Sequence, residues 1–216
     1  LILIDFPDFN LHVAATAKKL GIPVLYYISP QIWAWRSARV KKIKKRVDHM
    51  AVILPFETEF YKRSQVPVTF VGHPLMDCCH DAPRGDGQQQ DNAIPRIGFL
   101  PGSRDGEVSR LLPVMLQAAH LVAGKMPSVQ FLVSSAPSLD EHLVKSIVAQ
   151  YPLPNVEIVR QPVERLFEKC RLVVTASGTA SLQAAIWGIP MIITYIVSPL
   201  SYALGRLLIK VPYIGM

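Results

Sequence analysis

The sequence has 216 residues and a formal net charge of +7; 50% of its residues are hydrophobic and 18% are charged. This balance excludes a disordered chain, and the length suffices for one large or two modest domains that each bury a core. The three cysteines, Cys78, Cys79 and Cys170, lack metal-ligand spacing and favour free thiols in the cytoplasm. No apolar stretch reaches the roughly 18 residues of a transmembrane helix, so we expect any membrane contact to be peripheral.

Strands and helices are expected to alternate, because short β-branched apolar runs alternate with stretches of helical period, a pattern typical of βαβ units. The predicted strands are Leu1–Ile4, Val24–Ile28, His49–Ile53, Val68–Val71, Arg96–Leu100, Val129–Ser134, Val156–Arg160, Leu172–Thr175 and Met191–Tyr195. The predicted helices are Phe9–Leu20, Ala34–Arg46, Glu57–Arg63, Glu107–Lys125, Leu139–Tyr151, Val163–Lys169 and Thr179–Gly188. The sequence therefore predicts an α/β fold with parallel sheets.

A polar segment, Asp81–Asn92, interrupts this alternation and is predicted to be a linker. It divides the chain into an N-terminal lobe at residues 1–80, a linker at 81–93 and a C-terminal lobe at 94–216. Because Leu1 begins inside a strand and the last residues add no closing element, we expect both ends to be truncated. Two doubly wound lobes would bind ligands beyond the carboxyl ends of their strands.

Two carboxylates and an amide follow the first predicted strand: Asp5, Asp8 and Asn10. Asp8 precedes a helical stretch, where it is either a helix N-cap or a residue of the site. Asp5 comes too early to cap that helix. We therefore predict that Asp5 acts as a general base near a substrate hydroxyl.

Two small-residue loops link a strand to a helix in the C-terminal lobe. The first contains Gly102, Ser103 and Arg104, and the second contains Ser177, Gly178 and Thr179. Such loops present backbone N–H groups and the positive end of a helix dipole to phosphate oxygens. Arg104 would add a permanent charge with bidentate geometry. The pair of loops predicts a diphosphate site, and Gln183, one turn into the following helix, is placed to reach a ribose hydroxyl.

His73 ends the strand before the linker, where it either faces the cleft or has a structural role at a hinge. No catalytic triad, nucleophile elbow or metal cluster is recognisable, which disfavours hydrolases and metalloenzymes. Nine basic residues, most of them in Arg36–Arg46, follow Trp33 and Trp35. This segment is either a solvated helix face or a surface that contacts a lipid membrane.

Several motifs follow one another along the whole chain in a distinctive order. They are Ile4-Asp-Phe-Pro-Asp-Phe-Asn10, Tyr27-Ile-Ser-Pro-Gln-Ile-Trp-Ala-Trp-Arg36 with Arg39-Val40, Leu54-Pro-Phe-Glu57 with Phe60-Tyr61, Val71-Gly-His-Pro-Leu-Met-Asp77, Leu100-Pro-Gly-Ser-Arg104 with Glu107-Val108, and Ala176-Ser-Gly-Thr-Ala180. Their order and spacing resemble the lipid-A-disaccharide synthase family, and the Ser-Pro-x-x-Trp-Ala-Trp-Arg string is the most specific of them.

The resemblance implies an inverting, metal-independent glycosyltransferase of the GT-B type, with two Rossmann-like lobes and no cofactor. It implies UDP-2,3-diacylglucosamine as donor and 2,3-diacylglucosamine 1-phosphate as acceptor, with a β-1,6-linked tetraacyl disaccharide 1-phosphate and UDP as products. Asp5 then matches the base, and Arg104 with the two loops matches a diphosphate clamp. The expected location is cytoplasmic and peripheral at the inner membrane of a Gram-negative bacterium, without a nucleic-acid partner.

The chain departs from the family pattern at Gln183, where many relatives have Glu. The family's N-terminal Gly-Glu-x-Ser-Gly-Asp loop and its later Pro-Asn and Glu-Leu-Leu-Gln motifs lie outside the 216 residues, so the activity of these residues alone stays open. Two other interpretations remain. One is another GT-B transferase that uses UDP-GlcNAc, such as the peptidoglycan enzyme, and the other is a non-catalytic nucleotide- or lipid-binding module.

Overall fold

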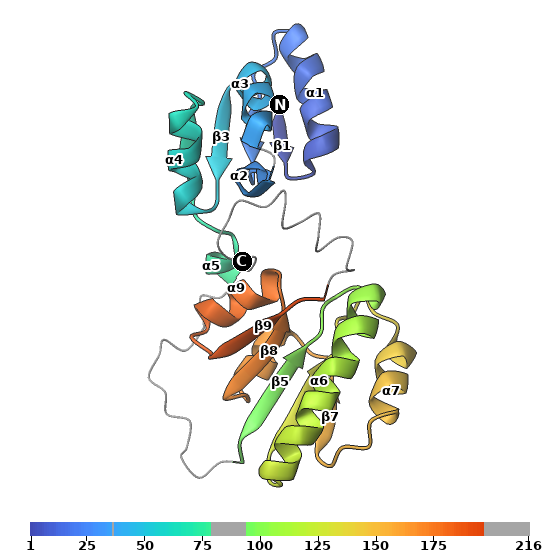
Figure 1. Ribbon diagram of the computed structural model, residues 1–216. Helices are drawn as coiled ribbons and strands as arrows, with labels where there is room; N and C mark the ends of the chain where they lie inside the picture. The colour runs from blue at the N-terminus through green and yellow to red at the C-terminus, as the bar shows by residue number, and fades with distance from the viewer. Residues whose placement is uncertain (36, 79–93, 197–216) are drawn as a thin grey trace. The chain divides into compact units, whose positions relative to one another are not determined.

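A computed structural model describes residues 1–35, 37–78 and 94–196, and these residues form two compact units, each built around its own sheet (Figure 1). The predicted linker at 81–93 lies outside the described residues, as do residues 197–216 of the predicted C-terminal lobe. Among the described residues, no helix has both the length and the apolar character needed to span a bilayer.

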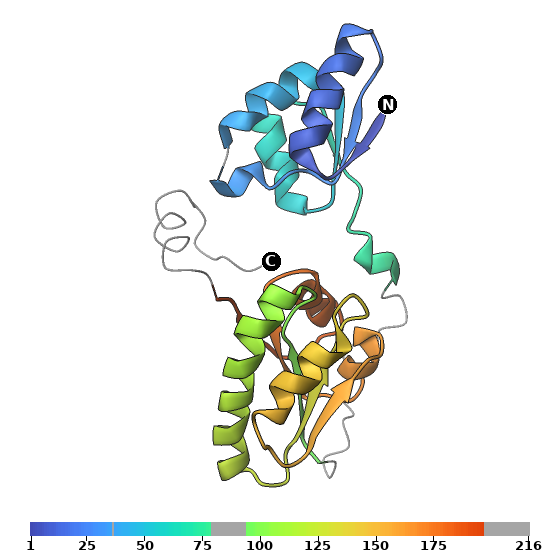
Figure 2. The same ribbon diagram turned by 90° about the vertical axis from the view of Figure 1, so that its right-hand side faces the viewer.

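The first unit is a four-stranded parallel sheet with the order β1-β2-β3-β4. Its elements are β1 Ile2–Ile4, α1 Pro7–Lys19, β2 Leu25–Tyr27, α2 Ile32–Trp35, the 3-10 helix η1 Ser37–Arg39, α3 Val40–Arg46, β3 His49–Val52, α4 Pro55–Arg63, β4 Val68–Phe70 and α5 Leu75–Cys78. Right-handed crossovers between strands that step in one direction place their helices on one face of the sheet. Figure 2 shows α1, α3 and α4 gathered on one side of the strands.

The core of the first unit lies between these helices and one face of the sheet. Leu3, Tyr26 and Met50 stand next to one another in the register of β1, β2 and β3, and all three are buried. Ala14 of α1 and Ile43 of α3 belong to the same buried cluster. Alternation along the strands therefore directs one set of side chains into the core, as a period of two requires.

The prediction of one continuous helix over Ala34–Arg46 is wrong. The structure has the short helix α2, the 3-10 helix η1 and then α3, with residue 36 outside the described part. Two separate anchors account for the division: the indole of Trp33 is hydrogen-bonded to Glu57 in α4, whereas Ile43 is buried against the sheet. With the chain divided, α2 can keep the hydrogen bond of Trp33 while α3 independently buries Ile43.

The second unit is a five-stranded parallel sheet with the order β7-β6-β5-β8-β9. Its elements are β5 Arg96–Leu100, α6 Asp105–Lys125, β6 Gln130–Ser134, α7 Glu141–Ala149, β7 Val156–Val159, α8 Val163–Phe167, β8 Leu172–Ala176, α9 Thr179–Ile186 and β9 Met191–Thr194. The chain starts at the central strand β5, moves outward through β6 and β7, and then returns to the other side of β5 at β8. The strand order thus reverses between β5 and β8.

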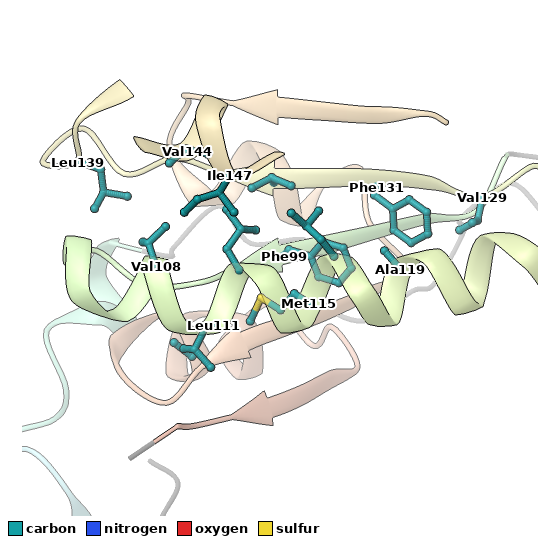
Figure 3. Close-up of a cluster of buried hydrophobic side chains, with 14 residues drawn as sticks. Phe99, Val108, Leu111, Met115, Ala119, Val129, Phe131, Leu139, Val144 and Ile147 are labelled. Carbon is teal, nitrogen blue, oxygen red and sulfur yellow. The ribbon is translucent and has the colours of Figure 1, made fainter. Parts of the chain in front are cut away.

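Both faces of this sheet are covered. On one face, the rings of Phe99 and Phe131 stack with their centroids 5.6 Å apart, and Met115 and Ala119 of α6 lie beside them (Figure 3). On the other face, Gly98 permits a close approach, because a Cβ there would lie 2.5 Å from the side chain of Leu166. Dense packing on both sides fixes the strands whose carboxyl ends carry the two small-residue loops.

Candidate functional site

The turn after β1 holds two consecutive residues in the left-handed region, Asp5 with φ 45° and Phe6 with φ 43°. Non-glycine residues adopt this conformation at a cost of about 1–3 kcal/mol each, and they persist when their surroundings hold them. Tyr26 provides one restraint, since its hydroxyl donates to the carbonyl oxygen of Asp5 at 2.6 Å. Asn10 provides another, since its Nδ2 donates to the carbonyl oxygens of Ile4 at 2.9 Å and Asp5 at 2.7 Å.

The side chains of the two aspartates differ in their surroundings. The carboxylate of Asp8 forms an ion pair of 2.7 Å with Arg39, whereas the exposed carboxylate of Asp5 makes no hydrogen bond or ion pair within the described residues. The N-cap interpretation of Asp8 is wrong, because Phe6 occupies the N-cap position and Asp8 lies in the first turn of α1. The early turn at Asp5 and Phe6 starts the helix sooner than the sequence predicted.

Tyr26 was not among the predicted site residues. Burial, with a smaller contribution from the nearby charge of Asp5, raises the pKa of Tyr26 to about 12, so its hydroxyl remains a donor at neutral pH. A tyrosine within a buried strand is usually a core residue, so the sequence offered no signal for this contact. Asn10, a predicted cleft residue, donates both hydrogen bonds, to Ile4 and Asp5, within the turn.

The second unit contains a pocket of about 260 Å³ at the carboxyl ends of its strands. The residues that line it are Leu100, Gly102, Ser103, Glu107, Ser134, Ala136, Val163, Ala176, Ser177, Gly178, Thr179, Ala180 and Gln183. The structure thus brings Gln183 together with residues of both predicted loops, which are separated by more than 70 residues, but Arg104 does not line the pocket. Their meeting follows from the reversal of strand order between β5 and β8, where ligands of open α/β sheets bind.

The loop after β5 has a conformation that requires glycine at one position. Gly102 has a φ of +116°, and a Cβ there would lie 2.5 Å from the Oε2 atom of Glu107. The side chain of Arg104 is 81% exposed, and its guanidinium pairs with Glu107 at 3.1 Å. Glu107, which sequence reasoning did not select, therefore brings a negative charge to the wall of the pocket.

The loop after β8 leads into α9 and offers a better place for an anion. The first turn of α9 contains no acidic residue, whereas that of α6 contains Asp105 and Glu107. The first N–H groups of a helix have no partner within the helix and carry partial positive charge. Ser181 stabilises the loop, since its hydroxyl donates to the carbonyl oxygen of Gly178 at 2.6 Å.

The other predicted site residues belong to the first unit. Asp5, Asp8 and Asn10 share the β1–α1 turn of the first unit. His73 precedes α5, where its Nδ1 accepts a hydrogen bond from the backbone N–H of Leu75 at 3.1 Å. Partial burial lowers the pKa of His73, which favours the neutral ring that this bond needs. Among the described residues, no group of three or more His, Cys, Asp or Glu side chains could hold a metal ion.

The whole chain matches one family in comparisons with known proteins: a sequence profile of lipid-A-disaccharide synthetase covers residues 1–216. This chain belongs to the lipid-A-disaccharide synthase family. It is 47% identical over 222 residues to the lipid-A-disaccharide synthase of Syntrophus aciditrophicus, and 41% identical over 220 residues to that of Coxiella burnetii. Each alignment covers 100% of the chain and 57% of the relative, so the chain spans a little over half the length of these family members.

Solved structures share the fold. The Staphylococcus aureus MnaA–UDP co-structure gives a TM-score of 0.64 at 10% identity, covering 94% of this chain and 60% of that chain. The UDP-GlcNAc 2-epimerase of Neisseria meningitidis bound to UDP-GlcNAc gives 0.59 at 13% identity, covering 94% and 61%. The prediction of an α/β fold with Rossmann-like lobes of the GT-B type is therefore confirmed for this member of the synthase family.

Proposed function

We propose that the protein containing this chain is a glycosyltransferase of lipid A biosynthesis. It transfers 2,3-diacylglucosamine from UDP-2,3-diacylglucosamine to 2,3-diacylglucosamine 1-phosphate and releases UDP. The family match over residues 1–216 carries this proposal. The same match favours this reaction over that of the peptidoglycan enzyme, and the pocket at the strand reversal of the second unit is consistent with a nucleotide-sugar donor.

In this proposal the donor's diphosphate lies against the start of α9. Backbone N–H groups after Gly178, with the hydroxyls of Ser177 and Thr179, are suited to phosphate oxygens, because no acidic side chain stands in that first turn. Gly102 and Ser103 form another part of the same pocket wall. The donor's ribose reaches Gln183, about one helical turn further along α9.

Arg104 supplies positive charge to the departing diphosphate. Its guanidinium is largely exposed and pairs only with the nearby Glu107 within the described residues, and an exposed pair of this kind is weak. A diphosphate offers more negative charge and bidentate geometry, so it competes well for the guanidinium. This charge stabilises the bond-breaking step more than it stabilises the bound donor.

Asp5 acts as the general base in the proposed reaction. Its carboxylate takes the proton of the acceptor's 6-hydroxyl as that oxygen bonds to the anomeric carbon of the donor. The bond between that carbon and the diphosphate breaks on the opposite side, which inverts the configuration, and the electron pair leaves with UDP. The restrained turn and the unpaired Asp5 carboxylate support this role, since a base must be positioned and available.

Both substrates carry acyl chains, so the proposal includes contact with the lipid surface of the inner membrane from the cytoplasmic side. Four lysines of α3 are exposed, and the three that are not hydrogen-bonded to Gln65, Lys41, Lys42 and Lys45, are suited to anionic lipid headgroups. Replacing all three with Gln should reduce co-sedimentation with phosphatidylglycerol vesicles by at least about tenfold, at roughly 1 kcal/mol per charge. Replacing the exposed Lys19, Lys125 and Lys169 instead should have a smaller effect, and equal losses in the two variants would contradict a role for α3.

The proposed reaction is tested by the substrate dependence of UDP release from the full-length protein. UDP should appear only when UDP-2,3-diacylglucosamine and 2,3-diacylglucosamine 1-phosphate are both present. UDP-GlcNAc, which lacks the acyl chains, serves as the control donor. Efficient release from UDP-GlcNAc with a peptidoglycan lipid acceptor, and none with the acylated pair, would overturn the proposal.

A further inference from the structure

Gln183, a residue of the pocket wall, is hydrogen-bonded to Glu164, which lies outside that wall. Gln183 of α9 lines the pocket, and its Nε2 donates to the Oε1 atom of Glu164 in α8 at 3.1 Å. Both side chains are partly buried. Glu164 itself does not line the pocket, so its hydrogen bond to Gln183 is the contact that links it to the pocket wall.

This contact fixes the orientation of the Gln183 amide. A carboxylate can only accept hydrogen bonds, so the amide must turn its NH₂ group toward Glu164. The amide is planar, and its carbonyl oxygen then faces away from Glu164. An amide without such a partner could turn over and present either group. Gln183 is therefore set to act as a hydrogen-bond acceptor.

The part of the pocket at Gln183 differs in chemistry from the part at the start of α9. An acceptor beside a carboxylate repels phosphate oxygens, which have no proton to donate at neutral pH, and it suits sugar hydroxyls, which do. Gln183 lies four residues after Thr179, or about 6 Å along the helix axis. The chemistry of the pocket thus suits an anion at Gly178 and Thr179 and a hydroxyl group at Gln183.

We propose that Glu164 is a positioning residue that orients the Gln183 amide, so that its carbonyl oxygen accepts a hydrogen bond from the ribose of a bound nucleoside diphosphate. The inference rests on the proposed function of this pocket. The inference extends that function, because ribose recognition then depends on both Glu164 and Gln183 rather than on Gln183 alone.

Exchanging the two side chains tests the pair. In Gln183→Glu, two carboxylates face each other at a distance near that of the present hydrogen bond, and like charges so close disfavour the bound arrangement. In the exchanged variant, Glu164→Gln with Gln183→Glu, the amide at 164 donates to the carboxylate at 183, whose second oxygen remains an acceptor for the ribose. The exchange restores one fixed direction of donation, which Gln183→Glu removes through like charges and Glu164→Gln removes because either amide can then donate.

The measurement is the Kd of the full-length protein for UDP, for 2′,3′-dideoxy-UDP and for inorganic pyrophosphate, by calorimetry. Gln183→Glu should weaken UDP binding by about tenfold or more, and the exchanged variant should recover to within about threefold of the original protein. The added charge of Gln183→Glu should lower pyrophosphate affinity less than UDP affinity, and retained pyrophosphate binding also shows that the variants fold. The Kd for 2′,3′-dideoxy-UDP should change much less between the variants than the Kd for UDP, because the analogue lacks the ribose hydroxyls.

Glu168→Gln is the matched control, because Glu168 follows α8 and pairs with the exposed Arg165 rather than with the pocket. It should leave all three affinities unchanged. An exchanged variant that binds UDP no better than Gln183→Glu would overturn the positioning role while leaving the donor site intact. If the original protein bound pyrophosphate but did not distinguish UDP from it, the assignment of a nucleotide to this pocket would fail as well.

Discussion

At the scale of single residues, the backbone of the first unit is strained at Asp5, the proposed base, and at Phe6. The left-handed backbone at Asp5 and Phe6 is restrained by hydrogen bonds from Tyr26 and Asn10 to the carbonyl oxygen of Asp5. Strained turns of this kind are concentrated at functional sites, where surrounding contacts offset their cost. The side chain of Asp5 contributes nothing to this restraint among the described residues, so its carboxylate can be changed without releasing the turn.

Asp5→Asn should therefore separate catalysis from folding. Asparagine tolerates the left-handed region, so the free energy of unfolding should change by less than about 0.5 kcal/mol. Loss of the general base should lower kcat by about 10²–10⁴-fold with little change in KM for the donor. Steady-state kinetics and thermal unfolding measure the two effects. Full activity in Asp5→Asn would remove Asp5 from the mechanism.

Arg104 allows a complementary test at the other unit. Because its side chain is exposed and its pairing with Glu107 is weak, Arg104→Ala should leave the melting temperature almost unchanged. Turnover should fall by about 10²–10³-fold through lost stabilisation of the departing diphosphate. Arg104→Lys keeps the charge without the bidentate geometry and should recover part of this loss. Unchanged turnover in Arg104→Ala would exclude the clamp.

At the scale of elements, one buried carboxylate links two helices of the first unit. Glu57 of α4 is 1% exposed; its Oε1 accepts from the indole of Trp33 in α2 at 3.2 Å, and its Oε2 accepts from the backbone N–H of Leu54 at 3.1 Å. A paired buried carboxylate of this kind fixes the geometry of its partners even when it adds little stability. The aromatic segment before α3 is thereby attached to α4.

The stability of this attachment should depend on pH. Desolvation raises the pKa of Glu57 in the folded state, although its hydrogen bonds act in the opposite direction. The folded state then binds the proton more tightly than an unfolded chain, in which the pKa is about 4.3. The stability from Glu57 is fully present below that value and is lost as the pH rises through the raised pKa.

Urea unfolding of the protein and of Glu57→Gln, from about pH 4 to about pH 8, measures this dependence. Within residues 1–216, a Trp187→Phe background leaves Trp33 and Trp35 as tryptophan reporters, and both belong to the first unit. The free energy of unfolding of the Glu57 protein should fall relative to that of Glu57→Gln as the pH increases. A difference that stays constant with pH would contradict the raised pKa.

The elements also show what the sequence could and could not predict. All nine predicted strands exist, because β-branched runs between turn residues leave little alternative in an α/β chain. The helix α5, four residues long at Leu75–Cys78, was missed because a single turn has no period to detect. The two loops of the pocket were predicted from their small residues, whereas the contact between Glu164 and Gln183 depends on tertiary packing across 19 residues.

At the scale of the whole molecule, each parallel sheet places its polar loops at the carboxyl ends of its strands. The chain covers 57% of the length of its relatives from Syntrophus aciditrophicus and Coxiella burnetii, so the proposed reaction is assigned to the full-length protein. In the proposed function, the pocket of the second unit binds the nucleotide diphosphate, and the first unit supplies the exposed carboxylate of Asp5 on a restrained turn. Donor binding should therefore respond to changes in the second unit, and acceptor activation to changes in the first.

The most direct test is the structure of the product formed by the full-length protein from UDP-2,3-diacylglucosamine and 2,3-diacylglucosamine 1-phosphate. Mass spectrometry and NMR should find a tetraacyl disaccharide 1-phosphate with a β-1,6 linkage, in a one-to-one ratio with UDP. Release of UDP with free diacylglucosamine and no disaccharide, or a product with an α linkage, would contradict the inverting transfer proposed for this protein.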